Sequence, residues 1–152
     1  MTQTLAKSTR AIAFVATFVG AFLGIYYIGK GKPTQGLRLF MSIGIVPLSL
    51  LSAFRHMALP GNIIKKQEFF EFEAGGANLA IGVAGIVTLA KKMDNASLGL
   101  VFLTYAVYLL MSLIAWLIYH RKKASKWTSV NFVAIISILT YFSYVGFTAK
   151  DE

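Results

Sequence analysis

The sequence predicts an all-α, polytopic integral membrane protein, folded as a helical bundle with five transmembrane helices. The chain is 57% hydrophobic but only 14% charged, whereas soluble domains carry about 25% charged residues. Its apolar residues gather into five runs, most of them close to the roughly 20 residues that a helix needs to cross a bilayer. The runs lack the alternating pattern of a transmembrane β-strand, so we expect helices.

The five predicted spans are residues 11–29, 37–54, 74–90, 96–119 and 129–149. The third has only 17 residues and is rich in glycine and alanine, which puts it at the lower length limit for a span. A bundle of four spans is therefore the alternative. We expect a single membrane domain over 1–152, with a helical hairpin at 7–54 and three further helices at 74–152.

The first run follows Lys7 and Arg10, as the apolar part of a signal peptide would. It is longer than the core of about 7–15 residues in a signal peptide and has no small-residue cleavage pattern, so we interpret it as a retained span. In the second span we expect Pro47 to kink the helix or to open it locally. Proline has no N–H, and its ring clashes with the preceding turn.

The net charge of +9 comes from 15 Lys and Arg against 6 Asp and Glu. These charges flank the apolar runs, so topology and anionic lipid headgroups explain them better than nucleic acid, which we do not expect as a partner. With five spans, nine Lys and Arg lie on the side of the N-terminus and six on the other side. This asymmetry favours a multi-pass protein of the cell membrane with a cytoplasmic N-terminus.

No residue pattern predicts a catalytic centre. The chain has no cysteine, which excludes disulfides and thiolate metal sites, and it contains neither a P-loop nor a nucleophile elbow. No ionisable residue falls in the middle of a span, and His56 and His120 stand apart at span boundaries. We therefore expect no metal, no cofactor and no enzyme. Lipid chemistry that uses one of these histidines is the weakest alternative.

Small residues recur at every fourth position in two of the spans. They are Ala16, Gly20 and Gly24 in the first span and Gly76, Ala80 and Ala84 in the third. Such faces let membrane helices approach closely. We favour packing within the bundle, and the alternative is an interface with an oligomer or a membrane partner. Asn78, in the third span, is a candidate for a hydrogen bond between helices.

The longest connection, 55–73, mixes basic, acidic and aromatic residues. Its last part holds half of the six carboxylates and consists of Glu68, Phe69, Phe70, Glu71, Phe72 and Glu73. We interpret 55–73 as an amphipathic interfacial loop, with the rings in the headgroup layer and the charges in water. The alternative is a docking surface for a partner or a cation.

The first hairpin resembles the TM-two domain, a family of paired membrane helices. The resemblance rests on segments 18–24 (FVGAFLG), 27–30 (YIGK) and 36–40 (GLRLF), and it covers about residues 7–54. It implies a hairpin used for interaction rather than catalysis, with a tight turn that involves Tyr27, Gly29, Lys30 and Gly36. Glycine at 29 and 31 would permit that turn.

These features favour a small accessory or assembly subunit that recognises a membrane partner through helix–helix interaction. The alternative is a homo-oligomeric transporter or channel for a neutral or hydrophobic solute. The expected partners are the lipid bilayer, anionic lipid headgroups, and either another membrane protein or further copies of this chain.

Overall fold

The computed structural model describes residues 2–58, 68–119 and 126–150, and no strand occurs among them. The elements in chain order are α1 (Thr2–Gly29), α2 (Pro33–Leu39), the π-helix η1 (Phe40–Ile45), α3 (Val46–Ala58), α4 (Glu68–Ala90), α5 (Asn95–Tyr119) and α6 (Lys126–Thr148). By length and composition five helical stretches can cross a membrane, including the third at Phe72–Ala90. The predicted all-α membrane bundle with five spans is confirmed over the described residues.

The chain divides into two compact units, residues 1–93 and 94–152, where the sequence predicted one membrane domain. The first, called here the N-terminal unit, holds α1, α2, η1, α3 and α4. The second, the C-terminal unit, holds α5 and α6. Each unit is described by itself.

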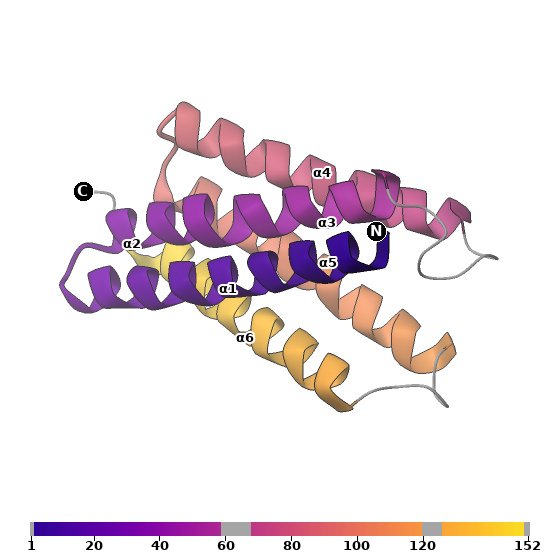
Figure 1. Cartoon of the computed structure of the whole chain (residues 1–152). Coiled ribbons are helices and arrows are strands. Elements are labelled where there is room, and N and C mark those ends of the chain that lie inside the picture. Colours follow the sequence, from indigo (N-terminus) through magenta and orange to yellow (C-terminus); the bar gives the residue numbers. More distant parts are fainter. Residues whose placement is uncertain (1, 59–67, 120–125, 151–152) are drawn as a thin grey trace. The chain divides into compact units, whose positions relative to one another are not determined.

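In the N-terminal unit the second span, made of α2, η1 and α3, lies between α1 and α4 (Figure 1). α1 packs against all three parts of this span, and α4 packs against η1 and α3. Successive spans run in opposite directions (Figure 1). The end of α1, the start of α2 and the end of α4 therefore share one end of the unit.

The second span widens just before Pro47. Residues Phe40–Ile45 form a π-helix, and the Val46 N–H donates to the oxygen of Met41, five residues earlier. Proline has no N–H to continue the α-helical pattern, and its ring crowds the preceding turn, so a wide turn is favourable there. The local opening predicted at Pro47 is present on its N-terminal side.

The first two spans meet through glycines. A Cβ added at Gly20 would lie 2.7 Å from the backbone nitrogen of Gly44, and one added at Gly36 would lie 2.5 Å from the oxygen of Gly24. Any larger side chain would force these backbones apart. The small-residue face of the first span is therefore used within the chain, with Ala16 half-buried along the same helix.

In the C-terminal unit α5 and α6 form an antiparallel pair. They meet at Gly99 and Gly146, where a Cβ added at Gly146 would lie 2.6 Å from the Cα of Gly99. Nearby, the fully buried rings of Phe102 and Phe142 have centroids 5.8 Å apart. No spacing pattern in the sequence predicts this glycine pair, because each apolar run holds only one of the two residues.

Candidate interaction surfaces

The small-residue face predicted for the third span points away from α3. A Cβ added at Gly76 would meet no atom within 4 Å, and Ala80 is exposed. Ala84 is half-buried, and the larger side chains of Val83 and Val87 are exposed on the same side. The predicted face therefore does not pack on the second span, and a different face of α4 makes that contact.

α4 packs on the second span through Gly75, Gly82 and Gly85. A Cβ added at Gly82 would lie 2.8 Å from Leu50 Cδ2, and one added at Gly85 would lie 3.0 Å from Met41 Sδ. Gly75 faces the same neighbour near the start of α4. The 3.6-residue period puts this face on the opposite side of the helix from the predicted one.

Asn78 belongs to the packed face and completes an alternating spacing of three and four residues from 75 to 85. This spacing was the signal in the sequence, because it follows one helix face more closely than repeated steps of four. The buried Asn78 side chain donates from Nδ2 to the Ala74 oxygen at 2.7 Å, which is in its own helix. Ser49 Oγ likewise donates to the Ile45 oxygen at 2.6 Å.

Both ends of the predicted loop at 55–73 are helical. α3 continues to Ala58, and α4 begins at Glu68, so the acidic and aromatic cluster forms the first turns of α4. Phe72 is 60% exposed there, and Glu73 is also exposed. Residues 59–67, and the side chains of Glu68, Phe69, Phe70 and Glu71, lie outside the described residues. An interfacial or docking role for this segment stays a prediction.

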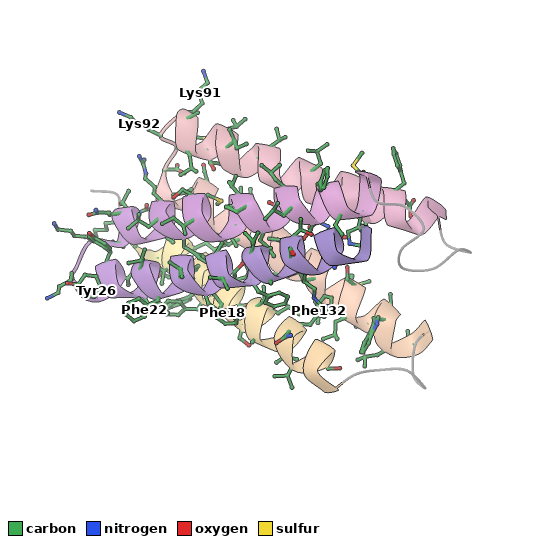
Figure 2. The ribbon with its side chains drawn as sticks, viewed as in Figure 1. Phe18, Phe22, Tyr26, Lys91, Lys92 and Phe132 are labelled. Atoms are coloured by element: carbon green, nitrogen blue, oxygen red, sulfur yellow. The ribbon has the colours of Figure 1, made fainter. Side chains whose placement is uncertain are left out.

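An aromatic row follows the exposed side of α1. Figure 2 shows Phe18, Phe22 and Tyr26 one turn apart, and all three side chains are exposed. Lys30 comes one turn later, with its Nζ 5.7 Å from the centroid of the Tyr26 ring. This pattern is typical of a lipid-facing helix that ends in the headgroup layer, where an aromatic ring and a lysine anchor it.

The turn after α1 depends on Gly31 rather than on Gly29. Gly31 has a φ of +74°, and its N–H donates to Ile28, while the Lys32 N–H reaches back to Tyr27 at 3.0 Å. This is the Schellman arrangement that ends many helices. Gly29 is the last residue of α1, and a Cβ added to it would meet nothing within 4 Å.

α4 ends in the same arrangement, but with lysine in the glycine position. Lys92 has a φ of 50°, and the Met93 N–H reaches back to the Thr88 oxygen at 3.0 Å. The oxygen of Met93 then accepts a hydrogen bond of 3.2 Å from Arg38 Nη2. Arg38 therefore joins α2 to the turn that ends α4.

The histidine predicted at the boundary of the second span lies beside Arg55. Arg55 Nη2 is 3.1 Å from His56 Nε2, and His56 Cβ also lines the space next to Gly75. His120 lies outside the described residues. Among the part of the chain that the structure describes, no three His, Cys, Asp or Glu side chains are grouped as a metal site would require.

Comparisons of this chain with models of protein families, with curated proteins and with solved structures find no match in any of the three. The resemblance of residues 7–54 to the TM-two domain stays a prediction. What the described residues establish is an all-helical, multi-pass membrane architecture.

Proposed function

We propose that this protein is a small accessory or assembly subunit that docks on a membrane partner through the outward face of α4. The observation that supports it is the open space at Gly76 and Ala80, where a second helix can approach the backbone. Gly20 and Gly24 of α1 are already in contact with the second span. Because membrane helices associate through small residues, a face of this kind that is left uncovered within the N-terminal unit favours a contact with another helix.

The start of α4 supports the same surface. Phe72 lies one turn before Gly76 and is exposed, and Glu73 is exposed beside it. Steps of three or four residues carry this side of the helix on from Ala80 to Val83. An aromatic ring at the membrane boundary fixes the depth of a helix, and the adjacent carboxylate offers a polar contact to a partner.

A homo-oligomeric transporter or channel is the second candidate. Its supporting observation is the wide turn at Phe40–Ile45 next to Pro47. Interrupted helices within the membrane leave backbone carbonyl groups that can face a solute. In this case the α4 face would join copies of the chain instead of a different polypeptide.

The proposal includes a cell-membrane location with a cytoplasmic N-terminus, which follows the distribution of Lys and Arg. A reporter that is active only in the cytoplasm, fused after residue 152, tests it. Five spans place that reporter outside the cytoplasm, so reporter activity would contradict the proposed orientation.

The docking face is tested on the full chain, purified from its native membrane in nanodiscs. We expect native mass spectrometry to find this chain in complex with a second polypeptide. Ala80→Leu should reduce the recovered complex by about tenfold, because the larger side chain keeps the partner helix away from the backbone. Ala11→Leu is the matched control, since Ala11 is an exposed alanine of α1.

Both substitutions add volume at exposed positions, so circular dichroism should show unchanged helix content. Complexes made only of copies of this chain would favour the second candidate. A second polypeptide that is retained equally by both variants would contradict docking through α4.

A further inference from the structure

We propose that Arg38 and Thr34 bind the phosphate group of an anionic phospholipid, at the end of the N-terminal unit where α1 and α4 end. The site is built from α2 and from the turn after α4. The site shares no residue with the docking face of α4, so its test is independent of the proposed function.

Arg38 has more hydrogen-bond donors than the described residues satisfy. Its Nη2 donates to the Met93 oxygen at 3.2 Å, while its Nε is buried without a hydrogen-bond partner among the described residues. A guanidinium group carries five N–H donors, and Arg38 lies inside a candidate span, Pro33–Met57, where unpaired charge is costly. The side chain as a whole is half-buried, so part of it is exposed to an anion.

Thr34 supplies a second donor on the same side of the helix. It precedes Arg38 by four residues, so the two side chains are neighbours along one face of α2. Its Oγ1 is also buried without a hydrogen-bond partner among the described residues. A guanidinium and a hydroxyl side by side match the several acceptor oxygens of a phosphate.

Within the N-terminal unit, the charged side chains at this end are all basic. Five cations of the unit lie near this end, namely Lys30, Lys32, Arg38, Lys91 and Lys92. Figure 2 shows Lys91 and Lys92 projecting from the end of α4. The three carboxylates of the unit all fall within residues 68–73, at the start of α4 and thus at its other end.

One carboxylate, that of Asp94, directly follows Met93 in the sequence and caps α5. Its Oδ1 accepts the Ser97 N–H at 2.7 Å, at the start of α5. Among the residues that the structure describes, the acceptor that Arg38 contacts is the backbone oxygen of Met93.

The depth of Arg38 indicates a lipid phosphate. With a rise of about 1.5 Å per residue, Arg38 lies about 7 Å along the helix from Pro33. An arginine this close to the end of a candidate span reaches the headgroup layer with its long side chain. Basic pockets between membrane helices bind anionic headgroups there. Tyr26, whose ring lies under Lys30, marks the same interfacial layer at the end of α1.

The test uses the full chain in phosphatidylcholine nanodiscs doped with phosphatidylglycerol, and it measures the dissociation constant of the anionic lipid by native mass spectrometry. We expect Arg38→Gln to weaken binding about tenfold, because it removes both the charge and the planar pair of donors. Arg38→Lys keeps the charge but loses the planar pair of donors, so its affinity should lie between those of the native chain and Arg38→Gln. Arg10→Gln, an exposed arginine at the other end of α1, is the control and should change binding little.

Two further variants keep the test decisive if Arg38→Gln folds poorly. Thr34→Val keeps the shape of the side chain and should weaken binding about fivefold, the effect of one hydrogen bond. Lys91→Gln alters an exposed side chain and should weaken binding by up to about fivefold, the effect of one charge near the membrane surface. A larger loss in Thr34→Val than in Arg10→Gln would support the site without relying on Arg38→Gln, whereas the loss in Lys91→Gln measures the contribution of the surface charge.

Three results would overturn the proposal. Equal affinity of Arg38→Gln, Thr34→Val and Arg10→Gln would show that binding is only diffuse attraction to the basic surface. Equal affinity for phosphatidylcholine would exclude an anionic headgroup as the preferred ligand. Displacement of phosphatidylglycerol by millimolar inorganic phosphate would identify a free-anion site instead of a lipid site.

Discussion

Lys92 ends α4 in the same left-handed backbone conformation with which Gly31 ends α1. The φ angles are 50° for Lys92 and 74° for Gly31. Both turns lie at one end of the N-terminal unit, and both close with an N–H that reaches back five residues. Glycine adopts this conformation without steric cost, whereas a residue with a Cβ does not. The strained residue, Lys92, directly precedes Met93, whose oxygen accepts the hydrogen bond from Arg38.

Lys92→Gly should therefore raise the free energy of unfolding by about 1 kcal/mol, because it removes the cost of the left-handed conformation. The measurement is reversible unfolding of the full chain in micelles. Lys91→Gly is the control, since Lys91 lacks a positive φ and glycine gains nothing there. If Lys92 also attracts lipid, the same variant becomes more stable but binds phosphatidylglycerol less well. A loss of stability in Lys92→Gly would contradict the assigned strain.

The turn after α1 gives the opposite prediction. Gly31→Ala should lower the free energy of unfolding by about 1 kcal/mol, because alanine at positive φ is strained. Gly29→Ala should be neutral or stabilise by up to about 1 kcal/mol, since Gly29 is helical and alanine favours helices. Melting temperatures of the two variants in the same detergent separate these outcomes. Equal destabilisation would mean that both glycines are needed for the turn.

The sequence predicted the first hairpin well because local rules decide it. Two long apolar runs joined by a short turn of glycine and lysine form an antiparallel pair of membrane helices. Pro47 predicts an irregularity in the second helix, because proline disrupts the preceding helical turn. The turn residue was harder to identify. Gly29 and Gly31 are equivalent in composition, and only the backbone path distinguishes the helical Gly29 from the left-handed Gly31.

A glycine in a close approach should tolerate substitution far less than one on an open face. Gly20→Leu should lower the free energy of unfolding by about 1–3 kcal/mol, because overpacking pushes α1 away from Gly44. Gly76→Leu adds the same atoms where a Cβ meets nothing within 4 Å, so it should leave stability nearly unchanged. Unfolding in micelles measures both variants. Similar losses would show that the α4 face is covered in the isolated chain.

The sequence alone does not predict which face of α4 packs on the second span. The small residues of this helix offer two alternative faces, one through Gly76 and Ala80 and the other through Gly75 and Gly82. Composition does not distinguish them, because glycine and alanine suit packing on either side. The choice depends on which side meets the second span, and that is a tertiary relationship. The alternating three-and-four spacing of the packed face was the only local signal.

Asp94 gives the chain a pH-dependent contribution at the start of α5. Hydrogen bonds from the Ser97 side chain and then from its backbone lower the pKa of Asp94 below its usual 3.8. Because the folded pKa lies below the unfolded one, the stabilisation is complete at pH values above 3.8 and is lost as the pH falls through the folded pKa. We expect the stability of the native chain to fall with acid in this range.

Asp94→Asn isolates this contribution, because asparagine also caps helices but does not titrate. The difference in unfolding free energy between the native chain and Asp94→Asn should be constant near neutral pH and should change below pH 3.8. The difference cancels the other carboxylates, which titrate in both proteins. Asp94→Ala removes the cap as well and should be less stable than Asp94→Asn at neutral pH. Parallel pH profiles for the native chain and Asp94→Asn would show that the Asp94 carboxylate titrates alike in the folded and unfolded chain.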